Sequence, residues 1–376
     1  MRKIVNIIIF LLVMPAFSFA IDPIDIAKAD RSLWPYQIDS DKNFDIASKC
    51  EMLAFVAVFN QYTNMSTEEL SKKTKVSKPN LASITQWKEL TKIRILENFK
   101  NLSEQSLTDI IAIKKNSTWK TLSAIQLQKA IPPNLAKWLE SSVNFYSNYI
   151  NEQLRLAALN PRLTSEIFLI APNEADGNNF AQKNFLLTFD DGPTVQNGNT
   201  DKLIKVLEDY NLSGMFFVLG DNLKIRLEQT SALKLNDLYG KNSVYSHGKT
   251  HVSHQKYAEW MQSLDYTNDL INKTFGGSQQ NKMVYFRPPY GQRNKRLTDY
   301  LALKNSKNIL WNIDSQDWSS KINAQEIADR QITLMLLWRK GILLFHDVHA
   351  KAQVAVPIIH DYFKKSNIVW VDSKSI

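Results

Sequence analysis

The stretch FLLTFDDGP, residues Phe185–Pro193, decides the fold class of the carboxyl-terminal half of this chain. Its first part is a continuous, mostly apolar run, which is typical of a strand buried on both faces of a parallel sheet. Two adjacent carboxylates, Asp190 and Asp191, follow the run directly and precede the turn pair Gly192–Pro193. Two acids at one buried strand end need a cation or another compensating group, because like charges in a cleft cannot both ionise cheaply.

Short apolar runs of the same kind recur along the chain, and stretches of helical length separate them. The further strand candidates are Met215–Leu219, the residues near Val244 and Tyr245, Met283–Phe286, Ile309–Ile313, Gly341–Phe345 and Ile368–Val371, and the helix candidates are Thr200–Tyr210, Lys295–Leu303 and Ala324–Trp338. Strands that alternate with helices predict a parallel sheet, either closed into a barrel or doubly wound. In a barrel, catalytic groups are expected at the C-terminal ends of the strands.

The region before this half has a different pattern. It contains no glycine between residues 22 and 162, and Ser, Asn and Pro separate its apolar periods. Apolar residues recur at steps of three and four from Leu135 to Leu154 and from Leu81 to Leu90, which predicts two helices with a buried stripe. Ser66 and Glu69 have the spacing of a capping box. We therefore expect a helical domain over residues 21–180, with an Asn-, Asp- and Gly-rich loop at 172–184 as its boundary.

The amino terminus has the features of a secretory signal peptide over residues 1–20. Arg2 and Lys3 precede the apolar run Ile4–Met14, and small residues lead to a cleavage site after Ala20. The run is shorter than the about 20 residues that a membrane-spanning helix needs, so we expect a periplasmic or secreted protein without an integral span. Cys50 is the only cysteine, which excludes an intrachain disulfide. The net charge is +9 without a long basic run; we expect no nucleic-acid partner, and attraction to an anionic wall polymer stays open.

All six histidines lie in the second region, and His247, His251 and His254 are close together. The four-residue spacing of His247 and His251 lets both imidazoles reach one cation in a helix or tight turn, but His254 leaves the choice of pair open. Three more predicted strands end in polar segments, namely Arg287–Gly291, Asp314–Trp318 and Leu344–Asp347. Each one alone fits a helix cap or a turn. Their convergence on one rim predicts a functional site.

In chain order, these segments resemble the five motifs of the polysaccharide deacetylases, the NodB-homology domain of carbohydrate esterase family 4. The matching segments are Thr188–Pro193, His247–His251, Arg287–Gly291, Asp314–Trp318 and Leu344–His346. The resemblance covers residues 181–376 and implies an α/β fold, an irregular (β/α) barrel of about seven strands, after the smaller all-helical domain. It does not extend to residues 21–180, whose role is unknown.

The resemblance also implies a metal centre and a catalytic base. Asp191, His247 and His251 would hold a divalent cation, expected to be zinc, with cobalt, nickel or manganese as alternatives. Asp190 would be the general base, and Arg287 would orient this carboxylate and keep it ionised.

The resemblance further implies an acid and a substrate pocket. His346 would be the general acid, with its imidazole partnered by Asp317 or, less favoured, by Asp314. Three more residues would contact the substrate: a backbone amide near Tyr290 at the oxyanion, and Trp318 and Leu344 around the acetyl methyl.

Two positions depart from the family pattern. Gly248 stands where the family usually has Ser or Thr, and Val252 stands where it usually has Pro. These departures affect the loop that would hold the metal, and they keep His254 open as an alternative ligand.

The sequence as a whole predicts a metal-dependent hydrolase that removes N-acetyl groups from N-acetylglucosamine residues of an exported or cell-wall polysaccharide, with peptidoglycan as the first candidate. An amine leaves poorly unless it is protonated, so the presence of His346 favours amide cleavage. The alternatives are an O-acetyl polysaccharide esterase and a noncatalytic glycan-binding protein in which the helical region is the functional part. The oligomeric state is not predicted.

Overall fold

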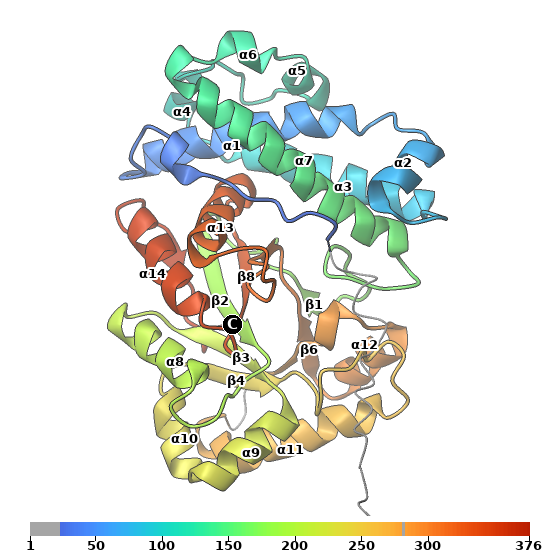
Figure 1. Cartoon of the computed structure of the whole chain (residues 1–376), viewed down its shortest axis with the longest axis vertical. Coiled ribbons are helices and arrows are strands. Elements are labelled where there is room, and N and C mark those ends of the chain that lie inside the picture. Colours follow the sequence, from blue (N-terminus) through green and yellow to red (C-terminus); the bar gives the residue numbers. More distant parts are fainter. Residues whose placement is uncertain (1–22, 280–282) are drawn as a thin grey trace, which may run out of the picture.

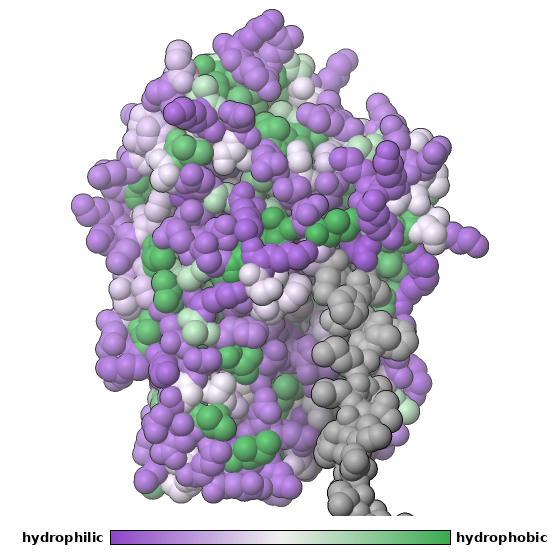
Figure 2. All heavy atoms as spheres, viewed as in Figure 1, coloured by the Kyte–Doolittle hydropathy of each residue, from purple (hydrophilic) through white to green (hydrophobic). Residues whose placement is uncertain are grey.

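The computed structural model describes residues 23–279 and 283–376 (Figure 1). The predicted signal peptide, residues 1–20, lies outside the described residues. Within the described ranges, no helix combines the length and the apolar character needed to cross a bilayer. On the face drawn in Figure 2, hydrophilic and apolar residues are interspersed.

A parallel sheet forms the centre of the carboxyl-terminal half. Its strands are β1 (Glu174–Ala175), β2 (Asn184–Asp190), β3 (Gly214–Val218), β4 (Ser243–Ser246), β5 (Val284–Phe286), β6 (Ser306–Ile309), β7 (Ile313–Asp314), β8 (Gly341–His346) and β9 (Val369–Trp370). The strand order is β1-β6-β5-β4-β3-β2-β8-β7, and β9 pairs with β2. The sheet is curled into a partly open barrel, and β1 and β7 are its two end strands. The predicted parallel (β/α) barrel is thus confirmed.

Helices follow most strands and cover the outside of the sheet (Figure 1). They are α8 (Asn199–Asp209), α9 (Gly220–Gln229), α10 (Ala232–Tyr239), α11 (Trp260–Gln279), α12 (Lys295–Leu303), α13 (Ala324–Trp338) and α14 (Ala352–Phe363). Both α12 and α13 have the bounds that the sequence predicts. Asn294 and Asn323 cap the amino ends of these two helices through side-chain oxygens. The residue at which each helix begins could therefore be predicted from the local sequence.

One strand prediction is wrong. The run Ile309–Ile313 was expected to be a single strand, but its first residue ends β6 and its last residue begins β7. β6 pairs with β1 and β5 near one end of the strand order, whereas β7 pairs with β8 at the other end. The run therefore crosses the opening of the barrel: the backbone N–H of Leu310 donates to the carbonyl of Ala175 on β1 at 2.7 Å, whereas that of Asn312 donates to the carbonyl of Ile342 on β8 at 3.4 Å.

The amino-terminal region is helical, as predicted. It contains α1 (Asp41–Gln61), α2 (Thr67–Thr74), α3 (Leu81–Lys100), α4 (Glu104–Thr108), α5 (Trp119–Ser123), α6 (Leu127–Ala130) and α7 (Ala136–Leu159). The stripe from Leu135 to Leu154 is largely buried, and Ser66 forms the predicted capping box with Glu69. Leu81 is an exception, since 44% of it is exposed at the first position of α3.

The helical region packs directly on the barrel. Helix α1 is buried along almost its whole length and contacts both α7 and α13 (Figure 1). Its polar side chains are paired inside the protein: Glu51 pairs with Arg31, and Asp45 pairs with Arg339 of the barrel at 2.8 Å. A single apolar cluster runs from Ile26 to Phe363 through both regions. The boundary at residue 180 between two domains stays a prediction.

Candidate active site

Strand β2 brings the two adjacent carboxylates to one end of the sheet. Asp190 is the last residue of the strand and is 2% exposed. Asp191 follows with a φ of 80°, and its backbone N–H donates to the carbonyl of Phe217 on β3 at 3.1 Å. At its C-terminal end β2 pairs with β3 and β8, so the segments after three parallel strands meet at this edge.

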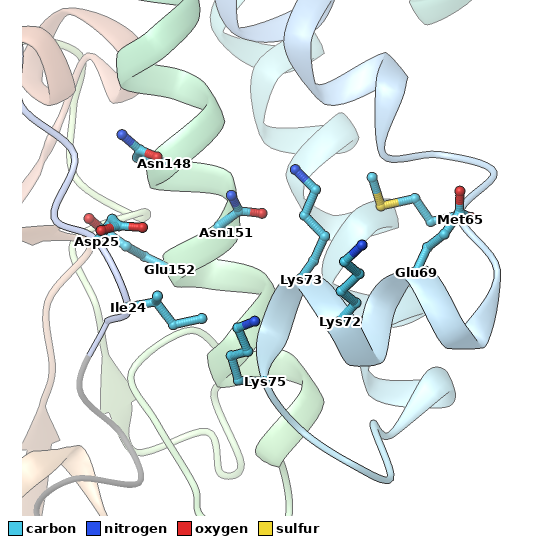
Figure 3. A pocket seen from close by; sticks show the side chains of 10 residues that line it. All are labelled: Ile24, Asp25, Met65, Glu69, Lys72, Lys73, Lys75, Asn148, Asn151 and Glu152. Atoms are coloured by element: carbon cyan, nitrogen blue, oxygen red, sulfur yellow. The ribbon is translucent and has the colours of Figure 1, made fainter.

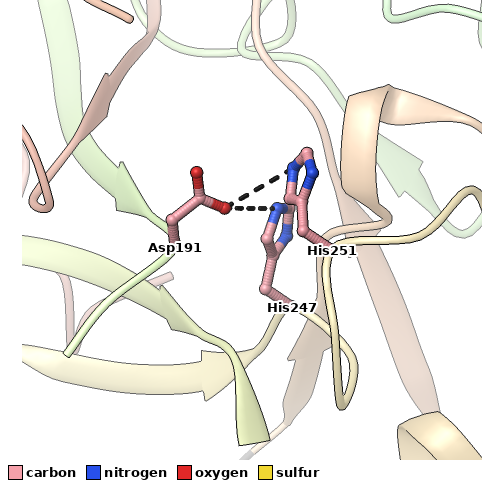
Figure 4. A group of neighbouring side chains, drawn as sticks. All are labelled: Asp191, His247 and His251. Atoms are coloured by element: carbon pink, nitrogen blue, oxygen red, sulfur yellow. Dashed lines mark ion pairs between the residues drawn. The ribbon is translucent and has the colours of Figure 1, made fainter. Parts of the chain in front are cut away.

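Asp191, His247 and His251 form a group of ligand atoms within 4.8 Å of one another (Figure 4). Oδ1 of Asp191 lies 3.5 Å from Nε2 of His247 and 3.5 Å from Nε2 of His251. This oxygen is buried and has no hydrogen-bond partner. A buried carboxylate oxygen without a donor, facing two imidazole nitrogens, fits the three protein ligands of a divalent metal site.

The two imidazoles are prepared to act as neutral ligands. Nδ1 of His247 lies 2.7 Å from the carbonyl oxygen of Arg287. A carbonyl oxygen only accepts, so Nδ1 carries the proton and Nε2 presents its lone pair to the site. Burial, reinforced by the neighbouring His251, holds the pKa of His247 well below its usual value, and burial also lowers the pKa of His251.

The structure places His254 outside this group. Its ring nitrogens lie 2.9 Å from the carbonyl of Val252 and 3.2 Å from the hydroxyl of Ser263. Gly248 packs against the same ring: its φ is +87°, and a Cβ atom there would lie 2.6 Å from Cε1 of His254. Because it has no Cβ, Gly248 leaves room for the buried ring of His254. His247 and His251 are therefore the two histidines that face Asp191.

Asp190 forms a buried ion pair with Arg287. Nη1 of the arginine lies 2.8 Å from Oδ1 of Asp190, and it also donates to the hydroxyl of Thr188 at 2.8 Å. The remaining guanidinium donors bind the carbonyls of Ile309 at 3.0 Å and Leu310 at 2.9 Å. Burial raises the pKa of Asp190 to about 6, although Arg287 opposes this increase. The arginine is fixed by backbone acceptors, so it holds the carboxylate in one orientation.

His346, at the end of β8, is bound to Asp317. Its Nδ1 lies 2.7 Å from Oδ1 of Asp317, and its backbone N–H donates to Oδ2 at 2.9 Å. Asp314 instead accepts from the backbone N–H of Gln316 at 2.8 Å. Burial by itself would lower the pKa of His346, but the carboxylates of Asp317, Asp191 and Asp190 raise it to about 10.

A cavity of about 250 Å³ opens over these groups. The predicted substrate residues Tyr290, Trp318 and Leu344 line it together with Asp190, Asp191, His247, His251 and His346. Tyr290 has a φ of 59° in the short turn Pro289–Gly291, and its ring centroid lies 4.3 Å from that of His251. Trp318 is 38% exposed at the rim, whereas Leu344 is 3% exposed.

The helical region also contributes to this cavity, which the sequence did not predict. Pro23, Glu166 and three residues of α7, namely Glu152, Gln153 and Leu156, form part of its wall. These α7 residues have an ordinary helical pattern in the sequence. They line the cavity because α7 packs near the C-terminal ends of the strands. This packing joins distant segments, so the local sequence pattern does not show it.

Residues 177–308 match the family model described as polysaccharide deacetylase. The resemblance to the polysaccharide deacetylases is confirmed for these residues. Among curated relatives, the chain is 29% identical over 215 residues to a peptidoglycan-N-acetylglucosamine deacetylase of Bacillus cereus, a match that spans 55% of this chain and 73% of the relative.

Two further curated relatives differ in their named substrates. A bifunctional xylanase/xylan deacetylase of Cellvibrio japonicus is 29% identical over 43% of this chain and 22% of the relative. A peptidoglycan-N-acetylmuramic acid deacetylase of Bacillus subtilis is 31% identical over 39% of this chain and 53% of the relative. The chain thus spans well under two thirds of both of these proteins.

Proposed function

We propose that this chain is an exported, metal-dependent enzyme that removes N-acetyl groups from N-acetylglucosamine residues of a polysaccharide, with peptidoglycan as the first candidate. The observation that carries the proposal is the buried, unpartnered Oδ1 of Asp191 facing Nε2 of His247 and of His251. Zinc is the proposed cation, because one carboxylate and two imidazoles suit it, although cobalt, nickel and manganese accept the same donors. The cation would supply Lewis-acid activation of water and of the acetyl carbonyl.

Asp190 is the proposed general base. Its second oxygen, Oδ2, lies 3.7 Å from Nε2 of His247 and therefore at the edge of the metal group, while Oδ1 is held by Arg287. With a pKa of about 6, this carboxyl is ionised at neutral pH and can accept the proton of an attacking water. Arg287 is a positioning residue in this proposal, since it fixes the orientation of the base.

His346 is the proposed general acid. Asp317 binds the protonated Nδ1, which leaves Nε2 as the atom that can donate to the leaving nitrogen. A pKa of about 10 keeps this imidazole protonated at neutral pH. Cleavage of an amide benefits from such a donor, because the amine must be protonated as it departs. The cavity that Trp318 and Leu344 line would receive the acetyl methyl, with a backbone amide near Tyr290 directed at the developing oxyanion.

Two relatives named for peptidoglycan support a cell-wall glycan as the substrate and an exported location. The relative named for xylan deacetylation supports a second candidate function, the removal of O-acetyl groups from a polysaccharide. The two candidates differ in their need for the acid. An ester releases an alcohol more readily than an amide releases an amine, so loss of His346 should impair amide cleavage more strongly.

The test is acetate release from N-acetylglucosamine oligomers, peptidoglycan and acetylated xylan, with and without a chelator. Asp190→Asn should reduce the rate on the true substrate by at least about a hundredfold, which is typical for loss of a general base. Asp299→Asn, an exposed carboxylate paired with Lys295 at 2.7 Å on α12, is the matched control and should keep the rate. Full activity in Asp190→Asn, or activity that survives complete metal removal, would contradict the proposal.

A further inference from the structure

A groove of about 400 Å³ lies between α2 and α7, next to the active-site cavity (Figure 3). Glu152 of α7 lines both hollows, and the chain segment at residues 23–25 borders both as well. The α7 residues of the groove and of the cavity extend from Asn148 to Leu156, a distance of roughly 12 Å along a helix. This span is within the length of an oligosaccharide of a few sugars.

The groove has two walls of different chemistry (Figure 3). Lys72 and Lys73 of α2, together with Lys75 at its carboxyl end, form one wall. All three lysines are exposed, and within the described residues none of them forms an ion pair. The ammonium of Lys73 lies 5.2 Å from the centroid of the Tyr62 ring.

The acidic residues of the groove offset the charge of this wall only in part. Glu152 is already paired with Arg330 at 2.7 Å, and Glu69 accepts the backbone N–H of Ser66 at 2.7 Å in the capping box. Asp25 lies beside Glu152 on the opposite side of the groove from the lysines (Figure 3). In the described part of the chain, the groove thus has three lysines against two carboxylates that pair with no cation, those of Glu69 and Asp25, and its net charge is positive.

The opposite wall offers hydrogen-bonding groups from α7. Asn148 and Asn151 extend from the helix toward the groove (Figure 3), and the amide oxygen Oδ1 of Asn151 is buried without a hydrogen-bond partner. A side-chain amide both donates and accepts hydrogen bonds, so asparagines along a groove suit sugar hydroxyls.

We propose that this groove is a glycan subsite that selects carboxylate-bearing polymers, with the lysines binding the carboxylates and the asparagines binding sugar hydroxyls. The inference rests on the proposed deacetylation and gives the helical region a role in it. The neutral acetyl group occupies the cavity with the acidic catalytic residues, while the negative charge of the same polymer lies in the groove. Substrate selection thus uses a part of the chain outside the residues that match the deacetylase family.

Two polymers with the same backbone test the subsite: carboxymethyl chitin, which carries carboxylates, and neutral glycol chitin. Equilibrium binding and kcat/KM for acetate release are measured for both at low and at high salt. The triple variant Lys72→Gln/Lys73→Gln/Lys75→Gln should lose about tenfold on carboxymethyl chitin at low salt, since exposed ion pairs each contribute little. It should stay within about twofold of the wild type on glycol chitin. The difference should shrink at high salt because mobile ions screen exposed charges.

The matched control is Lys114→Gln/Lys120→Gln/Lys129→Gln, which removes the same charge from exposed lysines of the same region outside the groove. Equal losses in both triple variants, or equal losses on both polymers, would overturn the subsite. Weaker binding to phosphatidylglycerol vesicles with unchanged binding to carboxymethyl chitin would assign the lysines to a membrane surface and also overturn it. If neither polymer releases acetate, the proposed function fails, and the binding measurements still decide the subsite.

Discussion

Replacing Asp317 by asparagine tests how the protein keeps His346 protonated. The substitution keeps the size of the side chain but removes the charge 2.7 Å from Nδ1. Asp317 is the main influence that raises the pKa of His346 to about 10 against the effect of burial. A bound cation would offset the negative charges of Asp190 and Asp191. Asp317 would therefore account for the larger share of the pKa increase of His346 in the metal-bound enzyme. Without the Asp317 carboxylate, we expect the pKa of His346 to fall to or below an ordinary histidine value of about 6.5.

The expected loss of activity depends on pH. At pH 8, an imidazole with a pKa of about 6.5 is only about 3% protonated, so the rate should fall roughly thirtyfold relative to the wild type. At pH 6 most of the imidazole is protonated in both proteins, and the rates should differ by less than about twofold. The assay is the pH dependence of acetate release, with the His346 imidazole followed by NMR titration.

Asp314→Asn is the comparison, because Asp314 lines the same cavity and does not contact His346. It should change the pH profile much less than Asp317→Asn does. A loss in Asp317→Asn that is equal at both pH values, or an unchanged His346 titration, would refute the view that Asp317 acts through the protonation of His346.

The remaining predictions concern packing and the metal group. Gly192→Ala should destabilise the fold by roughly 1–3 kcal/mol in urea unfolding, because its Cβ would overlap the buried carboxylate of Asp347. Glu51→Gln should cost about 3–5 kcal/mol in the same measurement, since it leaves the buried guanidinium of Arg31 without its ion-pair partner; a loss below 1 kcal/mol would contradict this. Asp191→Asn should weaken zinc binding at least about tenfold by calorimetry while the thermal midpoint of the metal-free protein stays within a few degrees, and unchanged affinity would remove this residue from the metal group.

Local chemistry determined the parts of the protein that the sequence predicted well. The run Phe185–Phe189 is apolar on both faces, so it fits only a strand that is covered on both sides. Helices α12 and α13 have the predicted bounds because caps and apolar periods lie within each segment. The acids, histidines and arginine of the site follow parallel strands, and the carboxyl ends of parallel strands share one edge of the sheet. The proximity of these residues could therefore be predicted without knowledge of any tertiary contact.

Tertiary packing decided the remaining features. Asp314 and Asp317 lie three residues apart in one segment; the family resemblance favoured Asp317, and the fold shows that its carboxylate reaches His346. Helix α1 was not predicted, because its buried Asp45, Lys49 and Glu51 obscure an apolar period and find their partners in distant segments.

The wall that α7 adds to the active-site cavity and the groove behind it have the same origin. They exist because the helical region packs against the barrel through one continuous core, with α1 in contact with both α7 and α13. Residues such as Glu152 and Lys73 have no distinguishing pattern in their own helices. A sequence determines which groups stand at the end of a strand or on one face of a helix, but contacts between distant segments determine which of those groups share a cavity.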